Sequence, residues 1–201
     1  MSHIKVIIFD GSGVITDEKP HKTAHDLSLR YGIAEDILWE SIFCKNYDLA
    51  AVGSISNQRY YQNVLAETHL PLSYTEFVDV FLSGSLVRPK MLKLLITIRP
   101  FVEKMILLSN QTKINTDYLH PILDPLIDTS FYSNECHIMK PDPDLYQLVA
   151  KSLSYQSSEL LFIDDREKNL IIPRQLGWDT LLFESEKQAI SFILNIRKDL
   201  L

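Results

Sequence analysis

The sequence has few cysteines: Cys44 and Cys136 are the only two among its 201 residues. Neither lies in a Cys-x-x-Cys pair or at the spacing of a zinc ligand set, so the sequence offers neither a disulfide framework nor a structural zinc site. Disulfide-poor chains are typical of reducing compartments. We therefore expect a reduced, cytoplasmic protein.

Long apolar runs and an excess of basic residues are also missing. No stretch approaches the roughly 18 apolar residues of a membrane span. Asp10 interrupts the one early apolar run, so we expect no signal peptide. With 20 Lys and Arg against 26 Asp and Glu, the net charge of −6 argues against non-specific binding to nucleic acid, which needs a basic footprint. We expect neither a membrane nor a nucleic-acid partner.

Apolar residues make up 46% of the chain, which is typical of a globular protein and not of a disordered one. A chain of 201 residues is long enough for one large hydrophobic core, or for one core and a small insert. No internal repeat or low-complexity tract divides it further.

The segment 6–15, with the sequence Val-Ile-Ile-Phe-Asp-Gly-Ser-Gly-Val-Ile, stands out near the N-terminus. Its first four residues predict a short strand buried on both faces, as in a parallel sheet covered by helices. Ligands bind such sheets just past the carboxyl ends of the strands, where Asp10 lies. Gly11 and Gly13 allow a sharp turn and a close approach of the backbone to a ligand. The ordinary alternative is an aspartate in an Asp-Gly turn.

Further short apolar runs alternate with segments of helical periodicity in the second half of the chain, which predicts an α/β fold with a Rossmann-like parallel sheet flanked by helices. The runs that we interpret as strands are 105–108, 129–133, 160–163 and 180–183.

Between these parts, residues 21–83 show helical periodicity and no convincing strand. Ser56 is expected to cap one helix, and Ser73 with Glu76 resembles a capping box at the start of another. The polar segment 16–20 is expected to be a linker. These observations predict an α/β core of residues 1–15 and 88–201, interrupted by an all-helical block of residues 16–87.

Polar residues follow the expected strands or precede a helix at four places: Asp10, Ser109-Asn110, Lys140 and Asp164-Asp165. Each has an ordinary explanation, such as a helix cap or a solvated lysine. Because the carboxyl ends of parallel strands share one edge of a sheet, these groups can also converge. Clustered carboxylates suit Mg²⁺, which combines them with water and phosphate oxygens.

These residue types predict a site that binds a phosphate group and acts on it. Lys140 would neutralise Asp10 and a phosphate group, and the Ser109 hydroxyl would hold phosphate oxygens. Asp10 could attack phosphorus and form an aspartyl-phosphate, a recognised form of covalent catalysis.

At these residues the sequence resembles the haloacid dehalogenase (HAD) superfamily of hydrolases. The resemblance rests on four motifs in order: Asp-x-Ser-Gly-Val from Asp10, Leu-Leu-Ser-Asn at 107–110, Met-Lys-Pro-Asp-Pro at 139–143 and Phe-Ile-Asp-Asp-Arg-Glu-Lys-Asn at 162–169. The helical block resembles the cap that this family inserts after its first motif. Within the superfamily, the chain is similar to sugar-1-phosphate phosphatases and to the N-terminal phosphatase domain of soluble epoxide hydrolase.

The resemblance implies a role for each matched residue. Asp10 would be the nucleophile, and Ser109, Asn110 and Lys140 would contact the substrate, with Lys140 balancing charge. Mg²⁺ would be held by Asp10, the Ser12 carbonyl and Asp165, with Asp164 assisting. The implied activity is hydrolysis of a small phosphorylated metabolite, such as a sugar phosphate; the oligomeric state is not predicted.

Ser12 departs from the family pattern, because most of these phosphatases have a second aspartate there as general acid and base. A serine hydroxyl cannot fill that role at neutral pH. Two alternatives therefore stay open: a catalytically weakened HAD fold that binds a ligand or partner, and a metal-free 2-haloacid dehalogenase. The acidic pair Asp164-Asp165 argues against the dehalogenase, which has no use for a metal. Asn46, Tyr47 and Arg59 lie near helix breaks and are the weaker candidates for contacts from the cap.

Overall fold

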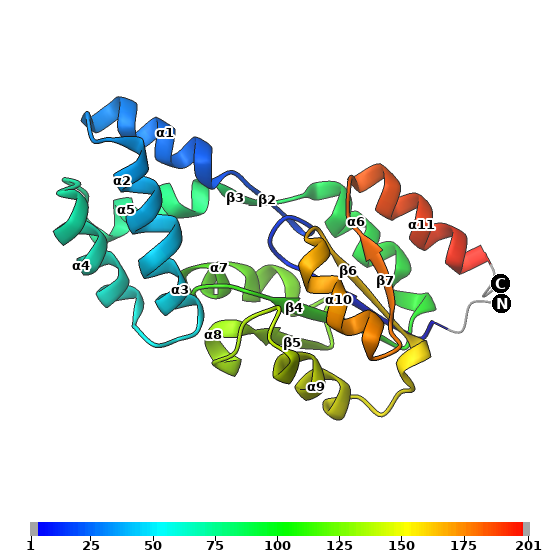
Figure 1. Cartoon of the computed structure of the whole chain (residues 1–201). Helices are drawn as coiled ribbons and strands as arrows, with labels where there is room; N and C mark the ends of the chain where they lie inside the picture. The colour runs from blue at the N-terminus through cyan, green and yellow to red at the C-terminus, as the bar shows by residue number, and fades with distance from the viewer. Residues whose placement is uncertain (1–3, 199–201) are drawn as a thin grey trace.

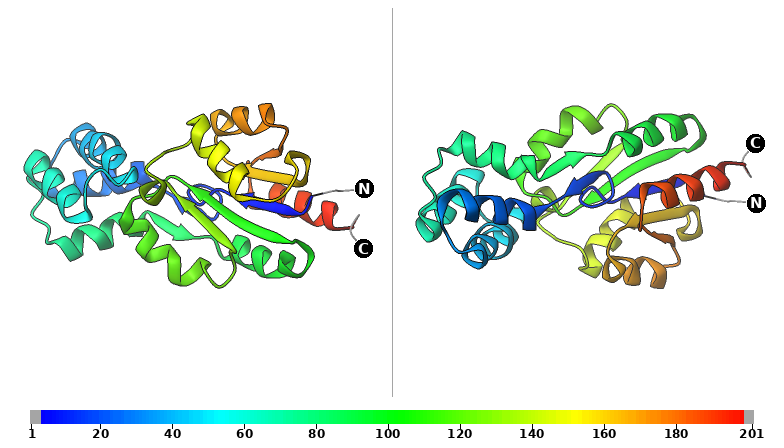
Figure 2. Two further views of the ribbon diagram at one scale, coloured as in Figure 1. Left: turned by 90° about the horizontal axis from the view of Figure 1, so that it is seen from below. Right: turned by 90° about the horizontal axis from the view of Figure 1, so that it is seen from above.

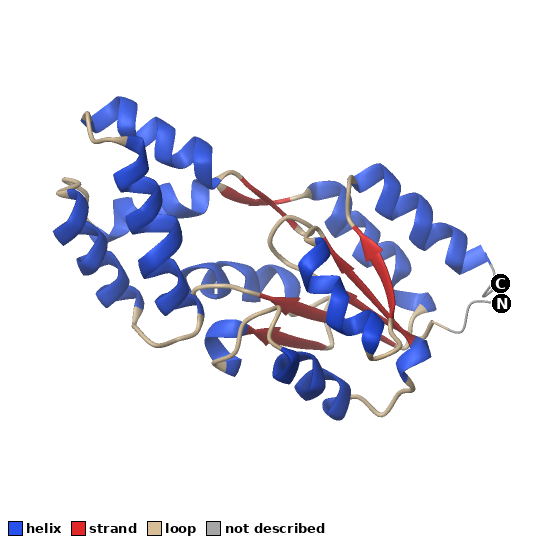
Figure 3. Ribbon diagram, viewed as in Figure 1, coloured by secondary structure: helices blue, strands red, loops and turns tan. Residues whose placement is uncertain are grey.

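The structure, a computed structural model, describes residues 4–198 and is built around a five-stranded parallel sheet (Figures 1 and 3). The strand order is β5-β4-β1-β6-β7, so the first strand of the chain is the central strand of the sheet. In the register of the sheet, Val6 lies opposite Lys104 on one neighbouring strand and opposite Leu160 on the other. The expected parallel α/β architecture is confirmed, and the strands are β1 (Val6–Phe9), β4 (Lys104–Ser109), β5 (Thr129–Tyr132), β6 (Leu160–Asp164) and β7 (Asp179–Leu182).

Helices cover both faces of this sheet, as the views from above and below show (Figure 2). Because side chains alternate along a strand, Ile7 and Phe9 pack on one face with α6, α7 and α11, while Val6 and Ile8 pack on the other with α9 and α10. The helical elements of this part are α6 (Pro89–Ile98), η2 (Arg99–Phe101), α7 (Lys113–Leu123), α8 (Ser133–Cys136), α9 (Pro143–Ser152), η3 (Ser157–Glu159), α10 (Glu167–Gln175) and α11 (Glu186–Lys198).

A second group of helices, which we name the helical unit (α1–α5), lies to one side of the sheet (Figure 1). It packs around its own hydrophobic cluster, which includes Leu38, Tyr60 and Phe77 and receives Ile114 from α7. The apolar spacing of residues 33–43 predicts one helix, and the structure divides this region between α2 and a π-helical segment, η1. The elements are α1 (Pro20–Tyr31), α2 (Glu35–Trp39), η1 (Glu40–Lys45), α3 (Asn46–Ala51), α4 (Asn57–Thr68) and α5 (Tyr74–Ser83).

Two short antiparallel strands, β2 (Thr16–Glu18) and β3 (Ser85–Val87), connect the helical unit to the sheet. The prediction of a linker at 16–20 was therefore wrong for residues 16–18. Arg88 fixes the base of this ribbon, since its guanidinium donates to the carbonyls of Thr16 and Gly13 and lies 3.2 Å from Asp17 Oδ1. The chain therefore enters and leaves the helical unit through one hydrogen-bonded ribbon, β2–β3.

A separate contact joins the far end of α3 to α8. The Ser133 hydroxyl donates to the Ala51 carbonyl at 2.5 Å, and His137 Nδ1 lies 3.0 Å from the Val52 carbonyl. Gly53 is required here, because a Cβ atom at this residue would lie 2.4 Å from the Asn134 carbonyl oxygen. This contact therefore holds the helical unit to the sheet at a place distant from the ribbon.

Several local predictions are confirmed, and one proline position differs. Ser56 accepts from the backbone N–H of Arg59, and Ser73 forms the expected capping box. The sequence predicts a helix over 112–119 that ends before Pro121. In the structure Pro121 lies inside α7, whose last residue Leu123 is fully buried in the core. Among residues 4–198, no helix combines the length and apolar character needed to cross a bilayer.

Candidate active site

The carboxyl ends of three adjacent strands bring the predicted acidic and hydroxyl groups together. Asp10 follows β1, Ser109 ends β4 and Asp164 ends β6. Since β1 lies between β4 and β6, these three side chains meet at one edge of the sheet. Lys140 reaches the same point from the loop between α8 and α9.

Lys140 lies between two buried carboxylates. Its Nζ is 2.8 Å from Asp10 Oδ1 and 2.7 Å from Asp164 Oδ2, and all three side chains are at most 5% exposed. Burial opposes the charge on Lys140, but the two carboxylates prevail and raise its pKa. Burial also raises the pKa of Asp10 well above its usual value, against the attraction of Lys140. One lysine thus does not fully compensate this pair, and a further cation would favour their ionised forms.

Removing the positive charge should therefore destabilise the protein. In metal-free buffer, we expect Lys140→Met to lower the free energy of unfolding by about 3–5 kcal/mol, because two buried carboxylates lose their only ion-pair partner among the described residues. Urea unfolding measures the change. Lys151→Met, at an exposed position of α9, is the control and should stay within about 0.5 kcal/mol of wild type. Equal stability of the two variants would contradict the importance of this ion pair.

The two neighbouring aspartates of β6 differ in what they already bind. Asp164 is fully buried and accepts from the Arg166 backbone N–H and from Asn169 Nδ2 as well as from Lys140. Burial raises the pKa of Asp164, but Lys140, the neighbouring Asp10 carboxyl and the Arg166 backbone N–H outweigh it and lower the pKa. Asp165 is exposed as a whole residue, but partial burial of its carboxyl group and the nearby Asp164 charge raise its pKa. Asp164 is thus suited to hold Lys140, and Asp165 retains oxygen capacity for another ligand.

The three carboxylates fit a divalent cation. Asp10, Asp164 and Asp165 each offer an oxygen, and these oxygens lie within 4.8 Å of one another. Gly13 makes room for this arrangement, since a Cβ atom there would lie 2.3 Å from Asp165 Oδ2. An all-oxygen donor set with few carboxylates is typical of Mg²⁺. The donor chemistry therefore agrees with the predicted cofactor.

A buried amide, Gln111, links the two serines of the site. Its Nε2 donates to Ser12 Oγ at 2.8 Å and to Ser109 Oγ at 3.1 Å, while the Ser109 hydroxyl donates to Asp10 Oδ1 at 3.1 Å. Gly11 must lack a side chain, because a Cβ atom there would lie 2.6 Å from Ser109 Oγ. Gln111 therefore fixes where the Ser12 hydroxyl points.

Asn110 fixes the loop that carries Lys140. Its side chain donates to the Lys140 carbonyl and accepts from the Lys140 backbone N–H, at 3.0 and 2.8 Å. Its own carbonyl accepts from the Tyr47 hydroxyl of α3 at 3.3 Å. The predicted contact of Asn110 with substrate stays a prediction, and the observed contacts make it a positioning group for Lys140.

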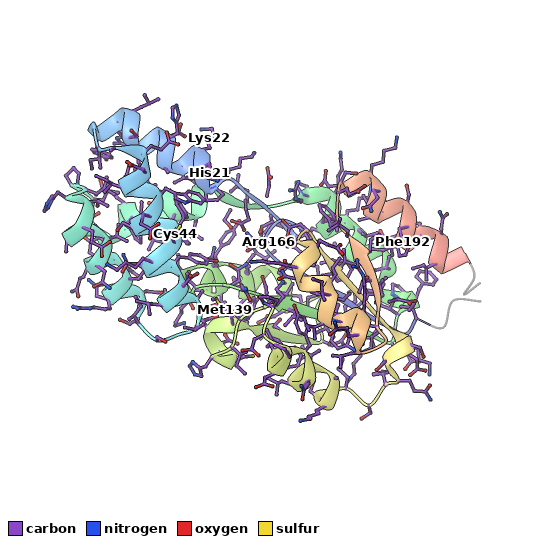
Figure 4. The ribbon with its side chains drawn as sticks, in the orientation of Figure 1. His21, Lys22, Cys44, Met139, Arg166 and Phe192 are labelled. Carbon is purple, nitrogen blue, oxygen red and sulfur yellow. The ribbon has the colours of Figure 1, made fainter. Side chains whose placement is uncertain are left out.

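Two adjoining cavities open between the helical unit and the sheet edge. One, of about 310 Å³, is lined by Asp10, Asn110 and Lys140, and the other, of about 260 Å³, by aromatic residues of the helical unit. Both are lined by Ser12, Tyr47, Asp48 and Arg166. In Figure 4, Arg166 lies at the start of α10, on the side that faces the helical unit. Of the expected reacting groups, Asp10 and Lys140 therefore line this space.

The three weaker candidates from the cap have different positions. Tyr47 lines both cavities. Asn46 is 1% exposed and bonds to Ser41, Glu67 and Asn63, which makes it a structural residue of the helical unit. Arg59 lies at the start of α4 and does not line either cavity.

Sequence reasoning missed four residues of this region: Gln111, Arg166, Asn169 and Glu18. Asn169 could have been found, because it follows Asp164 by five residues in the same motif. Glu18 lies in β2 and accepts from Thr16 Oγ1 and Ser85 Oγ, both at 2.6 Å. Burial raises its pKa, although the hydroxyls of Ser85, Thr16 and Ser12 act to lower it. The local sequence did not indicate Glu18, because the ribbon that holds it is formed by segments far apart in the chain.

The family is decided by comparison with known proteins. The family model of haloacid dehalogenase-like hydrolases matches residues 4–177. The chain belongs to this hydrolase family. The resemblance to the HAD superfamily that the four motifs indicated is thereby confirmed.

Solved structures agree in fold. A predicted HAD-like family hydrolase from Porphyromonas gingivalis is 22% identical, with a TM-score of 0.80 over 96% of this chain and 98% of that chain. A HAD family enzyme from Bacteroides thetaiotaomicron, in complex with magnesium and inorganic phosphate, is 20% identical, with a TM-score of 0.74 over 89% and 93%.

One curated relative matches a short segment. Mouse (Mus musculus) acyl-CoA dehydrogenase family member 10 is 40% identical over 53 residues, which is 26% of this chain and 5% of that protein. The chain therefore matches a small part of a much longer protein.

Proposed function

We propose that this HAD-family protein is a Mg²⁺-dependent phosphatase that hydrolyses a small phosphorylated metabolite through an aspartyl-phosphate on Asp10. The observation that carries the proposal is the arrangement of Lys140 between Asp10 and Asp164, with Asp165 beside them and the Ser109 hydroxyl on Asp10. The complex of the Bacteroides enzyme with magnesium and phosphate supports the same chemistry for this fold.

In this proposal each residue of the chain has a defined task. An Asp10 oxygen attacks phosphorus, the bond to the leaving oxygen breaks, and water then cleaves the aspartyl-phosphate to release phosphate and regenerate Asp10. Lys140 favours the ionised form of Asp10 and offsets phosphate charge. Ser109 donates to a phosphate oxygen once substrate displaces its bond to Asp10. Asp164, held by Asn169, keeps Lys140 in place.

Asp10, Asp165 and the Ser12 carbonyl would hold Mg²⁺, with Asp164 assisting as the anchor of Lys140. When bound, the ion supplies positive charge that offsets the phosphate charge in the transition state.

We propose that residues 16–87 form the cap of this enzyme and residues 1–15 and 88–201 its core. The separate hydrophobic cluster of α1–α5, the ribbon β2–β3 and the position of the two cavities between cap and core support this division. A cap over the reacting groups excludes water while Asp10 attacks.

The direct test is phosphate release from p-nitrophenyl phosphate and from a panel of phosphorylated metabolites that includes hexose-1-phosphates, with Mg²⁺ and with EDTA. EDTA should abolish phosphate release. Chloride release from 2-chloropropionate that survives EDTA would instead identify a dehalogenase.

Mg²⁺ should also stabilise the folded protein without any turnover. A ligand that binds only the native state adds RT ln(1 + [L]/Kd), about 2.7 kcal/mol at one hundred times Kd. We expect a rise in thermal midpoint with millimolar Mg²⁺ and its loss in Asp165→Ala. Asp144→Ala, on an exposed part of α9, is the control and should keep the shift. A wild type that shows no shift would remove the metal site from the proposal.

A second candidate, a HAD fold that binds a phosphorylated ligand without turning it over, is favoured by one observation. Ser12 occupies the usual place of the acid and base, and its hydroxyl is held by Gln111. Saturable binding of phosphorylated metabolites with no phosphate release under any metal condition would identify this binding function.

A further inference from the structure

The cavity of about 260 Å³ has an aromatic wall that the helical unit supplies. Trp39, Phe43, Phe81 and Tyr47, all from the helical unit, line it and form a continuous aromatic series. Successive ring centroids are 5.7 Å (Trp39–Phe43), 6.0 Å (Phe43–Phe81) and 6.4 Å (Phe81–Tyr47) apart. His21 stacks on Trp39 at 3.7 Å, and Figure 4 labels it at the start of α1. Aromatic faces attract cations through the ring quadrupole.

The same cavity contains carboxylates that lack a cationic partner among the described residues. Glu18 is partly buried and accepts hydrogen bonds from the uncharged hydroxyls of Thr16 and Ser85. Asp48 of α3, which is exposed, lines both cavities and has no ion-pair partner within residues 4–198, so the burial argument applies to Glu18. A partly buried carboxylate without a countercharge is costly, and a cationic group in the cavity would offset that cost.

The two cavities differ in charge in a way that orients a ligand. Lys140, Arg166 and Lys168 line the cavity that contains Asp10, and they suit a phosphate group. Of the two cavities, only the aromatic one is lined by Glu18 and by the rings of Trp39, Phe43 and Phe81, whereas Arg166 and Asp48 line both. A molecule that is anionic at one end and cationic at the other matches this distribution.

We infer that the preferred substrate is a phosphomonoester of an amino alcohol, whose cationic nitrogen lies among Trp39, Phe43, Phe81 and Tyr47 and near Glu18. This inference rests on the proposed phosphatase function and adds the chemical class of the leaving group. Neutral polyol phosphates are the competing class, because carboxylates also accept hydroxyl hydrogens, and the following experiment separates the two.

The experiment compares kcat/KM for phosphocholine and for 3,3-dimethylbutyl phosphate, which has the same shape with carbon in place of the charged nitrogen. We expect wild type to prefer phosphocholine by about tenfold, because a cation–π contact and the Glu18 carboxylate together favour the cationic nitrogen. Glu18→Gln keeps a hydrogen-bond acceptor for Thr16 and Ser85 and should reduce this ratio to about two. Trp39→Leu should reduce it as well. Asp79→Asn, which removes one charge from the exposed face of α5, should leave the ratio unchanged.

A ratio of one or less in wild type, faster turnover of glucose-1-phosphate than of phosphocholine, or an unchanged ratio in Glu18→Gln would overturn the inference. Hydrolysis of p-nitrophenyl phosphate distinguishes this failure from failure of the phosphatase proposal. Calorimetric titration of Asp10→Asn with the same two esters tests the cation site without turnover. Tighter binding of phosphocholine supports the site even if no ester is hydrolysed, and equal binding overturns it.

Discussion

Asp10→Asn should lower kcat for every phosphomonoester by about 10³-fold or more, the size of effect seen when a covalent nucleophile is removed. An amide cannot form the aspartyl-phosphate, and it is a weaker ligand for Mg²⁺. The fold should survive, because Lys140 keeps its ion pair with Asp164 at 2.7 Å and the oxygen of the new amide can still accept from Ser109. Steady-state phosphate release and circular dichroism measure the two effects.

Asp142→Asn, at the cap of α9 and outside both cavities, is the matched control and should retain activity. If Asp10→Asn keeps more than about a tenth of the wild-type rate, another group performs the attack and the assignment of Asp10 is wrong. A denatured variant would leave the rate uninformative, so thermal midpoints of both proteins belong to the same experiment.

Ser12→Asp should raise kcat/KM for an alkyl phosphate by about ten- to a thousandfold, the usual range for general acid–base catalysis. Alkoxide leaving groups need a proton, and the wild-type residue cannot supply it. Gln111 Nε2, which donates to Ser12 Oγ at 2.8 Å, is placed to hold the new carboxylate. Aryl phosphates should gain less, because p-nitrophenolate leaves without protonation.

Two variants control this result. Ser12→Asn has the shape of the aspartate without its acid–base capacity and should not raise the rate. Gln111→Ala combined with Ser12→Asp should lose part of the gain. Equal rates of Ser12→Asp and wild type on the alkyl ester, with high turnover in both, would show that another group already serves as acid and base. No turnover by either protein would support the ligand-binding alternative.

Local sequence signals predicted what depends on neighbouring residues. The strand at 6–9 and the caps at Ser56 and Ser73 follow from composition and spacing alone, and the structure confirms them. The meeting of Asp10, Ser109 and Asp164 was predictable because parallel strands end at one edge of the sheet.

Features formed by distant segments were not predictable. β2 has three residues and gains its regularity from β3, so residues 16–18 alone resemble a linker. Glu18 lines one cavity and Arg166 lines both, because the helical unit lies opposite them. Gln111 has no distinguishing sequence context, and its importance comes from contacts with Ser12 and Ser109.

The central position of β1 also has a consequence for synthesis on the ribosome. β1 is made first, yet its sheet partners begin at Lys104 and Leu160, so the nascent segment Val6–Phe9 has to wait for about half of the chain before it can pair. The helical unit is contiguous and has its own hydrophobic cluster, which takes only Ile114 from later sequence. It can therefore fold while the strand before it is still unpaired. Contiguous units fold early during translation, and apolar strand segments left without partners are exposed to association with other chains. The yield of folded protein should therefore depend on how quickly residues 104–109 follow the helical unit out of the ribosome.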